Sequence, residues 1–306
     1  MKRPFALLPI LAACSDYDVT RSTARDGWIQ SDRGAELDIL WVIDDSASMA
    51  EEQETLIERS AAFATPLAAA ELPFRLAITT TSGTGALLAE PIGDQTENIE
   101  DEFRDALSLA GVAGEREEAG FASAILAADH RSNEYARADA DLELIVYSDE
   151  DDHSGIDPAD FVSELEATRD GRAVVVSAVV GDLPTGCASA AGAADPGEAY
   201  VEAQEATGGA RESICSADTE GMLERLANEV LGLQTKFVLS ALPLLSTMEV
   251  RVDAVAIPRR DTDGWRYDGG DNSIVFDGWA IPRPGAAIEA FYYDYTGNRG
   301  EDTAAI

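Results

Sequence analysis

Oxygen-bearing side chains alternate in one short stretch, where Asp44, Ser46 and Ser48 directly follow the apolar run 37–43. A second carboxylate, Asp149, follows another apolar run of strand length. Carboxylate and hydroxyl oxygens are hard ligands, which suit Mg²⁺, Ca²⁺ or Mn²⁺ and suit soft metals poorly. Two acids that end neighbouring parallel strands would meet at one sheet edge and repel each other unless a cation lay between them. The pattern therefore predicts a divalent-cation site.

Apolar runs of strand length alternate with helical patterns between residues 36 and 235, which predicts a βαβ architecture with a parallel sheet. The runs are nearly continuous, which is typical of strands that are buried on both faces. The expected strands are 37–43, 74–81, 142–147 and 173–180.

The helical patterns stop at about residue 236. Short strand-like segments follow, and the stretch 269–272 (Gly-Gly-Asp-Asn) predicts a turn between two of them. We therefore expect residues 236–306 to form a small β-rich module.

The N-terminus has the layout of a secretory signal. Lys2 and Arg3 precede the apolar run 5–13, which is too short to span a bilayer. The run ends in Leu-Ala-Ala-Cys, which resembles the lipobox of bacterial lipoproteins, with Cys14 as the acylated residue. A plain signal peptide with an incidental cysteine is the alternative. We predict a signal peptide at 1–13 and a lipid-attached polar tether at 14–35.

Two more cysteines, Cys187 and Cys215, remain after Cys14. An even number in an exported protein predicts one disulfide, and two free buried thiols are the alternative. Neither cysteine has the paired spacing of a structural zinc site.

The charge balance limits the partners. The chain has 58 acidic against 22 basic residues and a formal net charge of -36. Nucleic acid is bound through clusters of Lys and Arg, so it is not an expected partner. A strongly acidic surface favours solubility and attracts cations.

The motif Asp44-x-Ser46-x-Ser48 after an apolar strand resembles the von Willebrand factor type A family, over about residues 36–233. Asp149, which opens Asp-Glu-Asp-Asp, resembles that family's downstream aspartate. The resemblance implies a doubly wound, mostly parallel sheet flanked by helices. It also implies a metal-ion-dependent adhesion site that holds Mg²⁺, with Ca²⁺ or Mn²⁺ as alternatives. In such a site a protein partner donates a carboxylate to the metal.

The whole layout is similar to bacterial lipoproteins that carry this domain, which implies a lipid-anchored protein of the cell envelope. Ser15, in place of Asp, after the lipidated cysteine is typical of sorting to the outer membrane.

The sequence departs from the family pattern at one ligand position. The family takes a threonine from the loop before a middle helix, and Val112 stands near that position without a hydroxyl. Glu115, a water or a partner's carboxylate would fill the gap, or the affinity is reduced or lost. Thr79, Thr80 and Thr81 end another strand near the same edge, although the family pattern places no ligand there.

Other interpretations remain open. Asp44, Ser46 and Ser48 could simply cap a helix, since Ser and Asp are preferred at that position. The chain could be a structural envelope lipoprotein with a degenerate metal site. A metal-dependent phosphohydrolase with Asp44 as nucleophile is disfavoured, because its Asp-x-Asp pattern would need an acid in place of Ser46. We expect a binding protein rather than an enzyme.

Overall fold

The computed structural model describes residues 23–30, 36–70, 72–114, 118–131, 135–189 and 192–294. The predicted signal peptide at 1–13 and the predicted lipidation site Cys14 lie outside these residues. The described chain divides into two compact units. The α/β unit contains residues 29–235 and 281–286, and the β unit contains the described residues of 1–28, 236–280 and 287–306.

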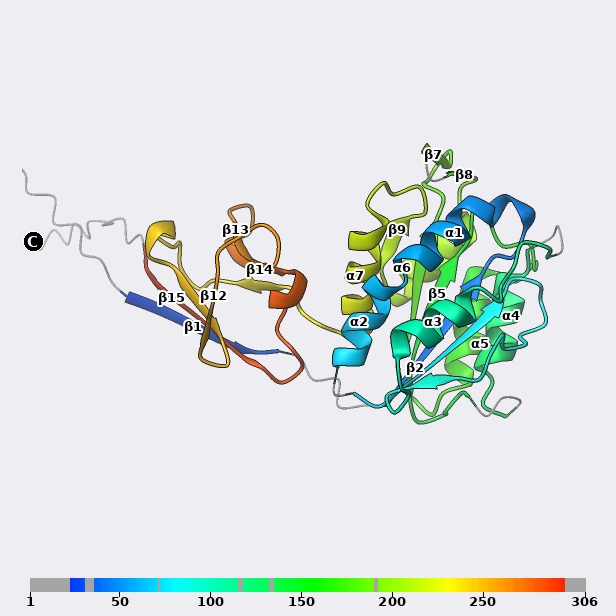
Figure 1. Cartoon of the computed structure of the whole chain (residues 1–306), viewed down its shortest axis with the longest axis horizontal. Coiled ribbons are helices and arrows are strands. Elements are labelled where there is room, and N and C mark those ends of the chain that lie inside the picture. Colours follow the sequence, from blue (N-terminus) through cyan, green and yellow to red (C-terminus); the bar gives the residue numbers. More distant parts are fainter. Residues whose placement is uncertain are drawn as a thin grey trace, which may run out of the picture. The chain divides into compact units, whose positions relative to one another are not determined.

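A six-stranded sheet forms the centre of the α/β unit (Figure 1). In spatial order its strands are β4 (Ile92–Gly93), β3 (Phe74–Thr80), β2 (Leu37–Ile43), β5 (Asp141–Tyr147), β6 (Val174–Val180) and β9 (Arg211–Ser213). β4 is antiparallel to β3, and the other neighbours are parallel. All seven residues of β2 are buried, because helices cover both faces of this strand.

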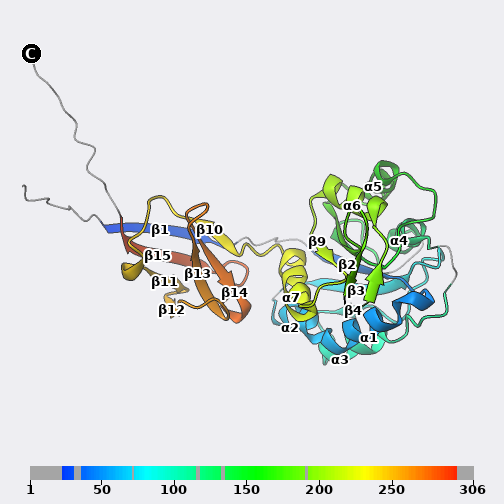
Figure 2. The ribbon, with the colours of Figure 1, turned by 90° about the horizontal axis from the view of Figure 1, so that it is seen from above.

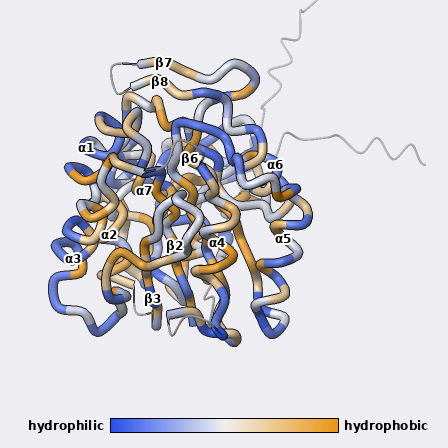
Figure 3. The backbone as a smooth tube through the Cα atoms, turned by 90° about the vertical axis from the view of Figure 1, so that its right-hand side faces the viewer, coloured by the Kyte–Doolittle hydropathy of each residue, from blue (hydrophilic) through white to orange (hydrophobic). Residues whose placement is uncertain are grey.

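Helices cover the two faces of this sheet in separate groups (Figure 2). One face carries α1 (Ala50–Arg59), α2 (Ala61–Ala69), α3 (Ile99–Leu107) and α7 (Thr219–Val230). The other face carries α4 (Gly120–Ala128), α5 (Pro158–Ala167) and α6 (Glu198–Thr207). In Figure 3 the hydrophobic colour is prominent along the central strands and α4, whereas hydrophilic segments are more frequent in the other outer helices and loops.

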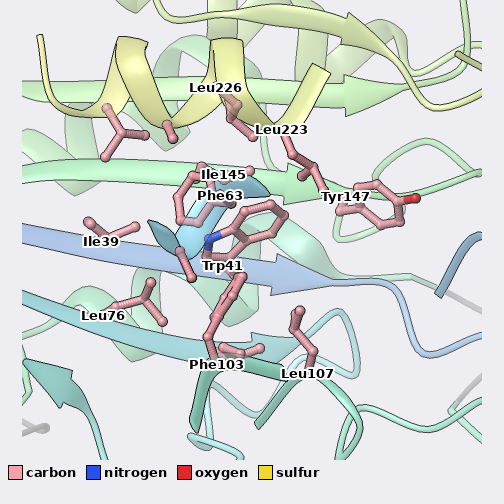
Figure 4. Packing of buried hydrophobic residues seen from close by; sticks show 14 of the residues in the cluster. Ile39, Trp41, Phe63, Leu76, Phe103, Leu107, Ile145, Tyr147, Leu223 and Leu226 are labelled. Atoms are coloured by element: carbon pink, nitrogen blue, oxygen red, sulfur yellow. The ribbon is translucent and has the colours of Figure 1, made fainter. Parts of the chain in front are cut away.

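Trp41 of β2 occupies the centre of one of the two cores (Figure 4). Its indole ring lies edge-on to Phe63, with ring centroids 4.9 Å apart, and lies 5.7 Å from the ring of Phe103. The side chain is completely buried. This cluster holds α2 and α3 against the sheet and thereby fixes the strand that ends at Asp44.

The β unit contains two sheets. Its larger sheet has the order β1 (Thr23–Ile29), β15 (Ala287–Tyr293), β11 (Glu249–Val252) and β12 (Val255–Ile257). The second has the order β10 (Lys236–Val238), β14 (Ser273–Asp277) and β13 (Gly264–Asp268). β13 and β14 form a hairpin around the predicted turn at 269–272. Short 3₁₀ helices lie at Leu245–Thr247 (η2) and Gly278–Ala280 (η3).

The predicted fold class is wrong as a description of this chain. The sequence predicted one doubly wound, mostly parallel sheet with a small appended module, whereas the strands of the described residues form four sheets. The six-stranded sheet is mixed, and the pairings described in the smaller sheets are antiparallel. Apolar runs indicate that a strand is buried, but they do not specify which strand lies beside which. The sequence therefore did not predict the antiparallel strand at the edge of the six-stranded sheet or the extent of antiparallel pairing elsewhere.

The predicted tether at 14–35 also needs correction, because β1 occupies Thr23–Ile29 within it. Exposed and half-buried positions alternate along this strand. Its sequence, TARDGWI, has few apolar residues, so it lacks the pattern that identified the other strands. No helix among the described residues is long and apolar enough to span a membrane.

Candidate functional site

Asp44 lies immediately beyond the carboxyl end of β2. Its backbone N–H donates to the carbonyl of Tyr147 at 3.0 Å, so the pairing of β2 with β5 extends to the start of the following loop. The Asp44 side chain is completely buried. Its Oδ1 accepts from the backbone N–H of Ser46 at 2.8 Å, and its Oδ2 accepts from the Ser148 hydroxyl at 2.5 Å. Both contacts fix the carboxylate at the rim of the sheet.

Hydroxyl groups connect this turn to the loop after β5. Ser46 Oγ and Ser48 Oγ lie 2.8 Å apart, and Ser48 Oγ donates to Asp149 Oδ1 at 3.3 Å. Ser46 and Asp149 are buried, whereas Ser48 is exposed. The structure thus brings together all four residues that the sequence singled out as metal ligands, and one of them faces solvent.

The two carboxylates lie in a negative environment. Burial and, to a smaller extent, the Asp44 charge together raise the pKa of Asp149 to about 7, although the hydrogen bond from Ser48 lowers it. None of the ion pairs between described residues involves Asp44 or Asp149. A bound cation would therefore supply the positive charge that the described neighbouring side chains do not.

The donor set suits a hard divalent cation, because it consists of carboxylate and hydroxyl oxygens at one edge. Within the described ranges, no group of three or more His, Cys, Asp or Glu side chains has the arrangement of a metal site. The fit here consequently depends on Ser46 and Ser48 as well as on the two aspartates.

The loop between α3 and α4 is fastened to the Asp44 turn. Gln53 Nε2 donates to the carbonyls of Asp44 and Gly111, each at 2.7 Å. The N–H of Gly114 donates to the carbonyl of Asp45 at 2.7 Å. A Cβ at Gly114 would lie 2.4 Å from Asp45 Oδ1, so this close approach requires glycine. The loop therefore borders the candidate site.

Val112 stands near the position where the family has a threonine, and it offers no hydroxyl. Its side chain is exposed in this loop. Glu115, the other residue considered for that position, lies outside the described residues.

Sequence reasoning missed Glu118, which lies two residues before α4. The residue is 1% exposed, and its Oε2 accepts a hydrogen bond from Thr81. Burial raises the pKa of Glu118 to about 7, with contributions from Asp44, Asp45 and Glu150, and the Thr81 hydrogen bond lowers it. The sequence offers one signal for this residue, which is an acid just before the apolar segment 120–128. Acids at the start of a helix are usually expected to face solvent.

Two residues of the acid run after Asp149 have a structural role. Asp151 Oδ1 accepts from the N–H of Ala199 in the first turn of α6, at 2.9 Å. Asp152 Oδ1 accepts from the N–H of Phe121 in the first turn of α4, also at 2.9 Å. Each carboxylate thereby satisfies a backbone donor at a helix start. His153 is exposed.

The predicted disulfide is confirmed, since Cys187 and Cys215 are bonded with their Cα atoms 6.1 Å apart. Cys187 begins the hairpin of β7 (Cys187–Ser189) and β8 (Gly192–Ala194). Immediately after β8, the N–H of Asp195 donates to the carbonyl of Asp149 at 2.8 Å. The disulfide therefore anchors a hairpin whose end contacts the loop of the candidate site.

Comparison with known proteins gives distant similarities in structure. The chain resembles the pilus adhesin SpaC from Lactobacillus rhamnosus GG in its open conformation, at 12% identity and a TM-score of 0.48, over 89% of this chain and 40% of that one. It also resembles proximal thread matrix protein 1 from the mussel byssus, at 12% identity and a TM-score of 0.42, over 71% of this chain and 52% of that one. The chain thus spans at most about half the length of these proteins. No protein-family model and no curated protein sequence matches it.

Proposed function

We propose that the α/β unit binds Mg²⁺ through Asp44, Ser46, Ser48 and Asp149, and that the bound ion receives a carboxylate from a protein partner. The observation that carries this proposal is the connected set Ser46–Ser48–Asp149, which lies beside the buried carboxylate of Asp44. Ca²⁺ and Mn²⁺ share the preference for such oxygens and are the alternative ions.

Exposure of Ser48 supports a role in partner binding. Mg²⁺ requires near-octahedral coordination and usually retains several waters when it binds to proteins. A water on the exposed side can exchange for an incoming carboxylate oxygen, whereas Asp44 is covered by the protein. The residues of this chain would hold and orient the ion, and the partner would complete its coordination.

Location at the cell envelope is the second part of the proposal. The Leu-Ala-Ala-Cys stretch that ends at Cys14 supports a lipid anchor to which the folded units are attached, and Ser15 after it supports sorting to the outer membrane. A disulfide in the folded chain also fits an oxidising compartment.

A structural lipoprotein with a degenerate metal site is the competing function. The exposed Val112 favours it, because the loop before α4 offers no hydroxyl there. The two functions differ in one measurable respect, which is whether recognition of a partner depends on a divalent cation.

The test is affinity capture from an envelope extract, with the full chain as bait, in Mg²⁺ or in EDTA. We expect the wild type and Ser163→Ala to retain the same partner in Mg²⁺ and to release it in EDTA. Ser163 is a matched control, since it is an exposed serine of α5. Ser48→Ala should lose the partner in both buffers. Capture that is indifferent to EDTA and to Ser48→Ala would favour the structural lipoprotein.

A further inference from the structure

The hydroxyl of Thr81 lies between two buried carboxylates. Thr81 follows β3, and its Oγ1 hydrogen-bonds Glu118 Oε2 and also lies 3.3 Å from Asp45 Oδ1. A threonine hydroxyl carries a single proton and donates to only one acceptor at a time. One of the two contacts therefore places oxygen against oxygen without a proton from threonine.

The outer oxygens of the two carboxylates differ in their hydrogen bonding. Ser82 Oγ donates to Asp45 Oδ2 at 2.7 Å, whereas Glu118 Oε1 has no hydrogen-bond partner among the described residues. Glu118 is 1% exposed, so water does not compensate this oxygen freely. Because Oε2 of the same carboxylate contacts Thr81, Oε1 also lies at this group. A buried, unpartnered carboxylate oxygen is costly, and a ligand that satisfied it would remove that cost.

Among the described residues, no basic side chain pairs with this group. No ion pair between described residues involves Asp45 or Glu118. The nearby acids Asp44 and Glu150 add to the negative potential at Glu118. Two buried carboxylates that share one hydroxyl in this potential need either a bound proton or a bound cation.

We propose that Asp45, Thr81, Ser82 and Glu118 form a second divalent-cation site, which takes Ca²⁺. These side chains offer up to six oxygens, and Ca²⁺ accepts six to eight oxygen ligands in flexible geometry. The group shares no residue with the site of Asp44, Ser46, Ser48 and Asp149.

The second site has a mechanical consequence. Its ligands come from the loop just after β2, the loop just after β3 and the position two residues before α4. An ion there fastens the loop between α3 and α4 to the two strand ends. Since Asp45 directly follows Asp44, this ion also stabilises the turn that carries the first site.

The test counts Ca²⁺ ions bound per full-length chain, by equilibrium dialysis and calorimetry at pH 7.5. The wild type and the control Glu90→Gln, an exposed acid outside the rim, should bind two ions. Glu118→Gln should bind one, and the double variant Ser46→Ala/Ser48→Ala should also bind one. Thr81→Val, which keeps the side-chain volume and removes the hydroxyl, should weaken one of the two ions at least tenfold. If circular dichroism shows that Glu118→Gln is unfolded, Thr81→Val decides.

The outcomes separate this inference from the proposed function. A single ion that is lost in the double serine variant and unaffected by Glu118→Gln overturns the second site and leaves the first intact. A single ion that shows the opposite pattern overturns the first site and supports the second. A single ion that both variants abolish means one shared site, and this also overturns the two-site proposal.

Discussion

The hydroxyl of Ser48 donates to the carboxylate of Asp149 at 3.3 Å, although the two residues are 101 positions apart in the sequence. The contact exists because β2 and β5 are parallel neighbours in register, so that Ile43 lies opposite Tyr147. The loops that follow the two strands therefore begin at the same edge. This relationship turns a short sequence motif into a candidate site.

Replacing Asp149 by Asn should weaken Mg²⁺ binding by about 10- to 100-fold, the range typical for residues that support a metal through its ligands. The change removes one of the two negative charges and keeps the size of the side chain. Calorimetric titration of the folded variant measures the effect. Asp160→Asn serves as the control, because Asp160 is an exposed acid of α5. Equal affinity in the wild type and Asp149→Asn would contradict the assignment.

The cation-free protein should be more stable at pH 5 than at pH 8. Asp149 and Glu118 have folded-state pKa values raised to about 7 from 3.8 and 4.5, so the folded state binds protons more tightly than the unfolded state. Their contribution to stability is present below the unfolded-state values and is lost as the pH rises to about 7. Thermal unfolding in EDTA across this range measures it.

The matching variant is Asp149→Asn/Glu118→Gln, which has no carboxyl group at either position. Its melting temperature should change much less between pH 5 and pH 8. Saturating Mg²⁺ should stabilise the wild type more at pH 8 than at pH 5, because protons compete with the cation for Asp149. An unchanged pH profile in the double variant would rule out these two groups as the source.

Reduction of the disulfide should lower the free energy of unfolding by about 3–4 kcal/mol. Cys187 and Cys215 are separated by 28 positions, and closing a loop of this length restricts the unfolded chain by roughly that amount. Urea unfolding of the wild type with and without reductant, beside Cys187→Ser/Cys215→Ser, measures the difference. The double variant should not respond to reductant, and a wild type that is equally indifferent would show that the bond adds no stability.

Asp38→Ala should destabilise the chain by about 3–5 kcal/mol, the cost of breaking a buried ion pair. Asp38 is completely buried, and its Oδ1 lies 2.8 Å from Nε of Arg137. It also lies 3.7 Å from the fully buried Arg169 side chain, which would lose its counter-charge. Denaturant unfolding tests this against Glu164→Ala, a substitution of an exposed acid in α5. A loss below 1 kcal/mol would contradict it.

The sequence was informative wherever burial leaves a pattern. The apolar run 37–43 coincides with β2, and the turn at 269–272 joins β13 to β14. The helical pattern that follows β2 is divided into a 3₁₀ turn (Ala47–Met49), α1 and α2, with a boundary at Ser60. The periodicity of a helix persists through such a break, so the pattern did not show it.

Glu118 illustrates what a sequence cannot reveal by pattern alone. Its burial depends on the approach of the loop between α3 and α4 to the ends of β2 and β3, and this approach requires Gly114 to lie against Asp45. Such contacts join segments that are distant along the chain. The family pattern, which has a threonine in this loop, directed the prediction to Val112, whose side chain is exposed. The buried acid that borders the site, Glu118, lies six residues later.

Anomalous diffraction from crystals grown with Mn²⁺ tests the central claim most directly, because it locates the ion. We expect a peak at the edge formed by the ends of β2 and β5, within about 2.5 Å of the Ser46 and Ser48 hydroxyl oxygens, a range typical of oxygen–metal bonds. Asp44 and Asp149 should contact the ion directly or through a water. Fully occupied peaks elsewhere on the chain, with none at Ser46 and Ser48, would contradict the account.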